Sequence, residues 1–124
     1  MVEKEVIETG GPKAGPYSHA IKAGNFLFIS GQVPSPDSSG IKAQTLSAFD
    51  KIKNLLEAAG TSVSNIVKIS VFLKDINNFK EMNDAYKEFF VQNGVIDKFP
   101  ARSTVEATSP LTDALVEIDA IAVI

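Results

Sequence analysis

The sequence predicts an α+β domain in which one sheet is backed by two helices. Two segments repeat apolar residues at helical spacing, and six shorter segments have the alternation or the β-branched content of strands. Their order along the chain is strand, hairpin, helix, strand, helix, hairpin, which is typical of such a layered fold. We expect the 124 residues to form a single domain, 1–124, because a chain of this length holds one core.

The N-terminal third is expected to be all strand and loop. A first strand is predicted over 2–8, and the glycines and prolines of 9–16 predict a loop. Residues 19–22 and 25–29 are predicted as two short strands of a hairpin, turning at Ala23-Gly24.

The two helices are predicted over 44–59 and 78–92. Gly60 and Gly94 are expected to end them, and Asn78 with Glu81 has the spacing of a capping box at the second. Their apolar stripes are Leu46, Phe49, Ile52, Leu55, Leu56 and Ala59, and then Phe79, Met82, Tyr86, Phe89 and Phe90.

Three further strands are predicted over 65–74, 99–107 and 114–124, with a turn region at 108–113. In the first of them, Val67, Ile69, Val71 and Leu73 are expected to point to one face. The short spacing of the last two predicts an antiparallel pair. Both faces of the sheet carry apolar residues, but two helices cover only one. We therefore expect closed association of several copies through the second face.

The composition excludes several classes of site. Because the chain has no cysteine, disulfides, thiolate metal sites and cysteine nucleophiles are excluded, and one histidine makes a zinc site improbable. The net charge of −3 argues against nucleic acid as a partner. No apolar run approaches the ~20 residues of a membrane-spanning helix, and the first eight residues lack a secretory signal. We expect a cytoplasmic, cofactor-poor protein.

Arg102 is the only arginine among the twelve basic residues. A guanidinium binds a carboxylate through two parallel hydrogen bonds, which a lysine cannot do. Arg102 follows Pro100, which favours an extended chain before it, and the small residues Ser103 and Thr104 come next. This setting suits a small carboxylate ligand, with backbone N–H groups of Gly31 or Thr104 as further donors. The alternative is a salt bridge at a strand edge.

Glu117 lies in the middle of the most apolar predicted strand. Burying a carboxylate costs roughly several kcal/mol unless it is paired or hydrated. Either the sheet face that carries Glu117 is therefore exposed to water, or Glu117 has a partner. Arg102, on the predicted neighbouring strand, is one candidate. Whether the two share a face depends on the hairpin register, because a slip of one residue turns a side chain to the other face. A structural ion pair is the alternative to a catalytic role, and Asp119 on the same face favours simple exposure.

Two hydroxyls and the one histidine complete the set of polar candidates. Tyr17 follows Gly15-Pro16, a loop that would hold the phenol in place, although a surface tyrosine closing a loop is the alternative. Ser30 precedes Gly31 at a strand end. His19 is expected to be structural, and since no Ser–His–acid arrangement can be built, a covalent serine hydrolase is not expected.

Seven motifs follow one another from Gly15 to the C-terminus. They are Gly15-Pro16-Tyr17-Ser18, Phe28-Ile29-Ser30-Gly31-Gln32, Glu57-Ala58-Ala59-Gly60, Val71-Phe72-Leu73-Lys74-Asp75, Asn83-Asp84-Ala85-Tyr86, Phe99-Pro100-Ala101-Arg102-Ser103 and Val116-Glu117-Ile118-Asp119-Ala120-Ile121-Ala122. Each is weak alone, but the series ending in Pro-Ala-Arg-Ser and Val-Glu-Ile is highly specific. Together they resemble the RidA (YjgF) family.

The resemblance implies a chorismate-mutase-like fold with one mixed sheet, and a homotrimer with clefts between subunits. It implies hydrolysis of reactive 2-imino and enamine acids, such as 2-iminopropanoate derived from 2-aminoacrylate and 2-iminobutanoate, to 2-keto acids and ammonia, without a cofactor. By match of motif, Arg102 would bind the substrate carboxylate and Glu117 would orient the attacking water. Tyr17, from an adjacent subunit, and Ser30 would supply hydroxyls. The remaining substrate-binding positions would be Gly31, Thr104 and Asn83.

The chain departs from the family pattern at three places. Thr104 stands where many members have cysteine, which leaves a backbone N–H contact intact, the segment 92–98 is longer than usual, and 108–111 inverts a common order. These changes bear on substrate range more than on chemistry. Two other functions stay open: a non-catalytic regulatory protein that binds a small carboxylate in the same cleft, and an RNA-acting protein, against which the net charge and the absence of tryptophan argue.

Overall fold

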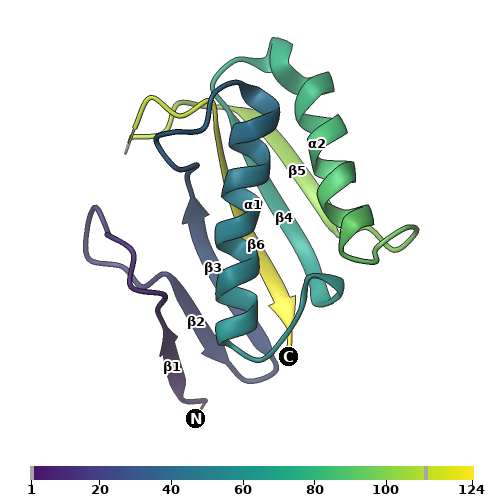
Figure 1. Ribbon diagram of the computed structural model, residues 1–124. Coiled ribbons are helices and arrows are strands. Elements are labelled where there is room, and N and C mark those ends of the chain that lie inside the picture. The colour runs from purple at the N-terminus through teal and green to yellow at the C-terminus, as the bar shows by residue number, and fades with distance from the viewer. Residues whose placement is uncertain (1, 111) are drawn as a thin grey trace.

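The computed structural model describes residues 2–110 and 112–124, which form one sheet with two helices on one face (Figure 1). Met1 and Leu111, the latter in the predicted turn, lie outside the described residues. The elements are β1 (Lys4–Ile7), β2 (Ala20–Ala23), β3 (Phe26–Gln32), α1 (Ile41–Ala58), η1 (Val63–Asn65, a 3-10 helix), β4 (Ile66–Leu73), η2 (Ile76–Asn78, a 3-10 helix), α2 (Phe79–Gln92), β5 (Ala101–Glu106) and β6 (Val116–Val123). The predicted fold class, a mixed sheet backed by two helices, is confirmed.

The strands lie in the order β1-β2-β3-β6-β4-β5. All neighbours are antiparallel except β4 and β5, which are parallel and are joined through α2. The prediction that the last two strands pair with each other is wrong. The β4–α2–β5 crossover fills one edge of β4, and β6 inserts between β3 and β4 (Figure 1). Short spacing in the sequence therefore did not mean adjacency in the sheet, and β5 is left as an edge strand.

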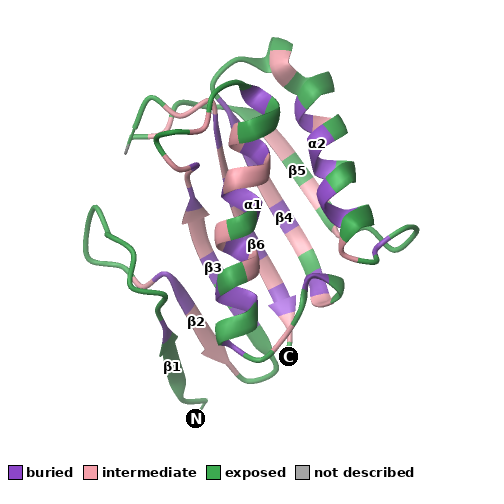
Figure 2. Ribbon diagram, viewed as in Figure 1, coloured by how far each residue is buried: buried purple, intermediate pink, exposed green. Residues whose placement is uncertain are grey.

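The core lies between the helices and the sheet face beneath them. Figure 2 shows buried positions on the sheet-facing sides of α1 and α2 and exposed positions on their outer sides. The first helix begins three residues earlier than predicted, at buried Ile41, directly after Gly40, whose φ is 87°. The largest fully buried side chains include Phe49, Phe90, Leu27, Ile52, Leu55, Leu56, Ile69, Leu73, Met82 and Ile118.

The predicted capping box at the second helix is wrong. Asn78 makes no side-chain cap hydrogen bond, because a 3-10 turn precedes the helix and is itself capped: the Asp75 carboxylate accepts from the backbone N–H of Asn77 at 2.9 Å. The predicted face of β4 also needs one correction. A bulge between Ile66 and Lys68 buries Ile66 and leaves Val67 exposed, while Ile69, Val71 and Leu73 face the core as predicted.

The face of the sheet away from the helices carries apolar side chains, as expected. Phe26 and Phe28 of β3 are exposed there, with ring centroids 6.2 Å apart, and they lie opposite Val123 and Ile121 of β6. Closed association through this face stays a prediction. Among the described residues, neither helix combines the length and apolar character that crossing a membrane would need.

Candidate functional site

Arg102 is held against aromatic rings on the helix-covered face of the sheet. It lies opposite buried Ile69 of β4, which in turn lies opposite buried Ala120 of β6. Since paired residues of neighbouring strands point to the same face, Arg102 is directed toward α2. Its Cζ lies 4.7 Å from the ring centroid of Tyr86 and 5.6 Å from that of Phe79. Both distances are typical of cation–π contacts, and the two rings therefore orient the half-buried guanidinium.

Three buried polar side chains lie on α2 and on the face of β5 that carries Arg102. Asn83 and Tyr86 are one turn apart on α2, and Thr104 is two residues beyond Arg102 on the same face of β5. Asn83 Oδ1, the Tyr86 hydroxyl and Thr104 Oγ1 are buried and make no hydrogen bond. Across residues 2–110 and 112–124, no carboxylate pairs with Arg102. Because buried polar groups are nearly always satisfied, this cluster has the properties of a site for a polar ligand.

Glu117 lies on the opposite face of the sheet. It pairs in register with Phe72 of β4, and Phe72 pairs with Val105 of β5. All three are an odd number of residues from the core-facing positions Ala120, Ile69 and Arg102, so they point away from the helices. The register that the sequence left open therefore separates Arg102 from Glu117 within one chain, which excludes the structural ion pair between them.

The Glu117 carboxylate is held between Ser109 and the backbone of β3. Ser109 Oγ donates to Glu117 Oε1 at 2.7 Å. A Cβ at Gly31 would lie 2.1 Å from Glu117 Oε2, so only a residue without a side chain lets the carboxylate lie there. Gly31 has no positive φ. Its requirement is space for Glu117, and not an unusual backbone conformation.

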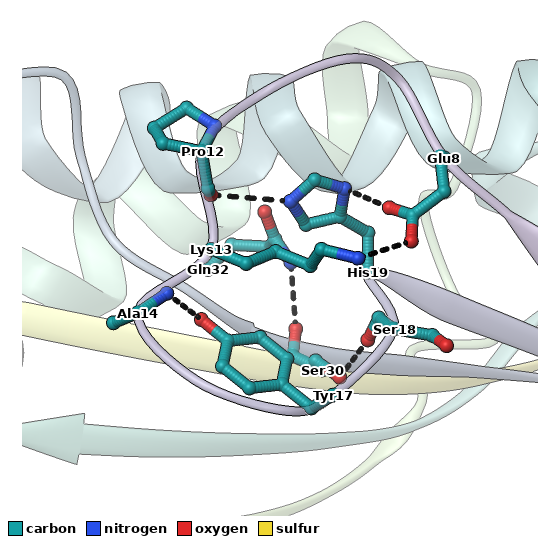
Figure 3. A network of polar contacts seen from close by, with 9 residues as sticks. All are labelled: Glu8, Pro12, Lys13, Ala14, Tyr17, Ser18, His19, Ser30 and Gln32. Atoms are coloured by element: carbon teal, nitrogen blue, oxygen red, sulfur yellow. Dashed lines mark hydrogen bonds and ion pairs between the residues drawn. The ribbon is translucent and has the colours of Figure 1, made fainter.

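A bulge in β3 brings Ser30 to the same corner. Between the pairs Ile29–Ala120 and Gln32–Ile118, Ser30 and Gly31 together lie opposite the single residue Asp119, which is the arrangement of a β-bulge. Ser30 Oγ donates to the carbonyl of Ser18 at 2.6 Å. That bond ties the end of the loop that carries Tyr17 to β3 (Figure 3).

The loop before β2 is closed by a network centred on Glu8 (Figure 3). Its carboxylate accepts from Lys13 Nζ at 2.8 Å and contacts His19 Nδ1, while His19 Nε2 faces the Pro12 carbonyl at 3.3 Å. The hydrogen bond from Lys13, with a further contribution from His19, lowers the pKa of Glu8 below its ordinary value, against a smaller opposing effect of burial. His19 is buried and serves this loop, as expected of a structural histidine. The Tyr17 hydroxyl accepts from the backbone N–H of Ala14 at 3.3 Å.

The loop also encloses a cavity of about 400 Å³ against β3 and α1. Tyr17, Gly31 and Gln32 line it from one side, and Lys51 and Asn54 of α1 from the other. Arg102, Glu117 and Ser30 do not line it. The cavity is therefore separate from the polar cluster around Arg102, and in one chain it does not join the candidate residues into a single site.

The candidate residues thus form two half-sites. The first, here called the arginine half-site, contains Arg102, Thr104 and Asn83 together with Tyr86, on the helix side of the β5 edge. The second, the glutamate half-site, contains Glu117, Gly31, Ser30 and Ser109, and Tyr17 lies on the loop that Ser30 ties to β3. Sequence reasoning missed Tyr86 and Ser109. Tyr86 belongs to the apolar stripe of the second helix. The one feature of the sequence that could have indicated a binding role is its hydroxyl, three residues after Asn83 and so on the same side of the helix. In the part of the chain that the structure describes, no group of three or more His, Cys, Asp or Glu side chains could hold a metal ion.

Comparisons with known proteins cover almost the whole chain. A family model described as Endoribonuclease L-PSP matches residues 10–124. A RutC family protein of Pyrococcus horikoshii is 48% identical over 96% of this chain and 97% of its own length. An Escherichia coli K12 protein named 2-iminobutanoate/2-iminopropanoate deaminase is 38% identical over 98% of both chains.

Solved structures agree with the fold. The crystal structure of E. coli TdcF with bound serine matches with a TM-score of 0.88 and 34% identity, over 97% of this chain and 98% of that one. The E. coli YjgF gene product matches with a TM-score of 0.86 and 39% identity, over 96% and 98%. The chain therefore belongs to the Endoribonuclease L-PSP family, which is the RidA (YjgF) family that its motifs resemble.

Proposed function

We propose that the protein hydrolyses 2-imino acids, and the enamines in equilibrium with them, to 2-keto acids and ammonia. The substrates are small, of the size of 2-iminopropanoate and 2-iminobutanoate. A 38% identical relative is named for this activity, and another relative binds serine, a small acid with a carboxylate and a nitrogen on the neighbouring carbon. Amide, hydroxyl, guanidinium and carboxylate groups of the chain supply the chemistry, with water as the second substrate.

The observation that carries the proposal is the unpaired guanidinium of Arg102. It is half-buried, it lies against two rings, and no carboxylate among the described residues neutralises it. A substrate carboxylate would fill that vacancy with two charge-assisted hydrogen bonds, each worth about 1.5–3 kcal/mol. We expect the backbone N–H of Thr104 and the side chain of Asn83 to supply further substrate contacts.

Glu117 then acts on water. Water adds to the carbon of the protonated imine as Glu117 orients it and accepts its proton, forming a C–O bond and a tetrahedral carbinolamine. Glu117 returns that proton to the nitrogen, the C–N bond breaks to release ammonia, and the hydroxyl proton passes to the Glu117 carboxylate as the C=O of the 2-keto acid forms. Ser109 fixes the carboxylate, and the hydroxyls of Ser30 and Tyr17, with the N–H of Gly31, hold the oxygen and nitrogen that change hybridisation.

The two half-sites meet only between two copies of the chain. Arg102 and Glu117 point to opposite faces of one sheet, so a single small acid cannot contact both within one protomer. We therefore place the Arg102, Thr104 and Asn83 of one protomer against the Tyr17, Ser30, Gly31 and Glu117 of the next. A cyclic homotrimer repeats this contact three times and covers the exposed Phe26 and Phe28.

A coupled assay tests the function. A threonine dehydratase supplies the imine, and ammonia or keto-acid release is followed with and without the purified protein. We expect wild type to accelerate release, Arg102→Ala to abolish the acceleration, and Arg102→Lys to lose most of it, because a point charge cannot bind a carboxylate in two places. Lys98→Ala, which removes an exposed cation four residues before Arg102, serves as the control and should match wild type. Full activity of Arg102→Ala contradicts the proposal, and 2-keto-acid binding without turnover favours the regulatory binder instead.

A further inference from the structure

The Tyr86 hydroxyl is a buried donor without a hydrogen-bond partner among the residues that the structure describes. Tyr86 is only 6% exposed, and its ring packs against Phe49 and Phe90 with centroids 5.4 Å and 4.8 Å away. The ring is therefore an ordinary part of the core. The hydroxyl is not, because it makes no hydrogen bond, whereas a buried tyrosine O–H usually finds a partner. A phenylalanine would fill the same space without this unsatisfied group.

The position of the hydroxyl connects it with the arginine half-site. The Arg102 guanidinium lies over the same ring, 4.7 Å from its centroid. Two more buried atoms have no hydrogen-bond partner. Asn83 Oδ1 lies on α2 with Tyr86, and Thr104 Oγ1 lies on the same face of β5 as Arg102. Three unsatisfied groups on the helix and the strand face that hold one unpaired cation need a common explanation, and a single bound ligand provides it.

The Tyr86 hydroxyl keeps its proton at neutral pH and can therefore act as a hydrogen-bond donor. Burial raises the pKa of Tyr86 to about 12, although the nearby Arg102 charge opposes the shift. At neutral pH the phenol therefore keeps its proton and cannot serve as the counterion of Arg102. It has an O–H to donate, and an anionic oxygen is the acceptor that forms the strongest hydrogen bond with it.

We propose that Tyr86 is a further substrate-binding residue, whose hydroxyl donates a hydrogen bond to the carboxylate held by Arg102. The identity of the ligand rests on the proposed function. Asn83 Oδ1 can only accept, so it complements the N–H of an imino or amino group on the neighbouring carbon. A 2-imino acid thus satisfies the donors with its carboxylate and the acceptor with its nitrogen. The Tyr86 ring has a second role, as the surface that orients the guanidinium.

Tyr86→Phe separates the hydroxyl from the ring. The variant keeps the aromatic packing, so its melting temperature should be close to that of wild type. We expect its affinity for 2-oxobutanoate, measured by calorimetry, to fall about tenfold or more, which is the effect of losing one hydrogen bond to a charged group. In the coupled assay kcat/KM should fall by a similar factor. Tyr86→Leu, which also removes the support of Arg102, should bind more weakly still. Lys87→Ala, an exposed change on the same helix, should match wild type in both assays.

The outcomes separate this inference from the proposed function. If wild type binds 2-oxobutanoate but hydrolyses no imine, and Tyr86→Phe weakens that binding, the inference stands and the proposed function fails. If wild type hydrolyses imines and Tyr86→Phe equals it in affinity and kcat/KM, the inference is overturned alone. Failure of wild type to bind 2-oxobutanoate at millimolar concentration also overturns it.

Discussion

Replacing Gly31 by alanine should displace the Glu117 side chain, although Glu117 itself is left unchanged. The new Cβ would lie 2.1 Å from Oε2, 2.9 Å from Cδ and 3.2 Å from Cγ of Glu117. Ordinary contact begins at 3.4 Å, so the carboxylate oxygen must move by about 1.3 Å. The other carboxylate oxygen accepts from Ser109 at 2.7 Å, and a shift of that size breaks this bond.

The same displacement sets the expected loss of stability and the expected loss of catalytic rate. Loss of a hydrogen bond to a charged group costs about 1.5–3 kcal/mol. The lower end applies to a half-buried carboxylate, and the reduced freedom of the unfolded chain returns about 0.4–1 kcal/mol. We expect a net destabilisation of about 1 kcal/mol, or roughly 4 °C in melting temperature. Misplacing a catalytic group by about 1 Å costs on the order of 100-fold in rate, so kcat should fall far more than stability.

Calorimetry and the coupled imine assay measure these two effects. Gly11→Ala is the matched control, because its Cβ would meet only the His19 ring, at ordinary distances of 3.9 Å from Cε1 and 4.0 Å from Nε2, and it should retain wild-type activity. In a Glu117→Ala background the Gly31→Ala change should cost no further stability, because the group it crowds is gone. The reasoning is refuted if Gly31→Ala is fully active, or if it costs as much stability without Glu117 as with it.

Three further predictions concern the loop, the buried phenol and the open face. Because the pKa of Glu8 is lowered, its stabilisation of the loop is complete above the ordinary value of 4.5 and is lost as the pH falls through the lower folded value; Glu8→Gln should speed tryptic cleavage after Lys13 at neutral pH, whereas Glu5→Gln should not. Because the pKa of Tyr86 is raised to about 12, its contribution to stability is present below pH 10 and declines between these values; an alkaline ultraviolet titration should show a step near 12 that Tyr86→Phe lacks, and a step near 10 in its place contradicts the burial. Phe28→Asp should shift sedimentation from trimer to monomer and abolish turnover, since it places a charge on the exposed apolar face; a wild type that sediments as a monomer would refute the closed association.

Local patterns predicted the helices and most of the sheet. Phe49, Ile52 and Leu56 recur at helical spacing and all lie on the buried face of α1, so the first helix could be predicted from the sequence alone. The hairpin turns at Gly24, whose φ of 59° is a conformation that glycine adopts readily. The order of the strands could not be predicted in the same way. The insertion of β6 between β3 and β4 depends on contacts far apart in the chain, which no local spacing encodes.

The site was predicted as a set of residues but not as an arrangement. Arg102 was singled out by rarity and Glu117 by an apolar setting. Their placement on opposite faces depends on the register of three strands, and the sequence cannot fix a register to one residue. Gly31 was expected to offer a backbone donor, and its more demanding role is to leave room for Glu117. Tyr86 was hidden because its ring obeys the helix pattern, and only the absence of a partner for its hydroxyl distinguishes it.

Complementation between two inactive variants tests the two-copy site most directly. Arg102→Ala and Glu117→Ala chains, each with its own tag, are co-expressed and purified through both tags, so that every trimer contains both variants. In a cyclic trimer one cleft of the three then combines an intact Arg102 with an intact Glu117. We predict that the mixed trimers recover about one third of wild-type activity, while each variant alone stays inactive. Mixed trimers as inactive as the separate variants would contradict a site shared between neighbouring copies.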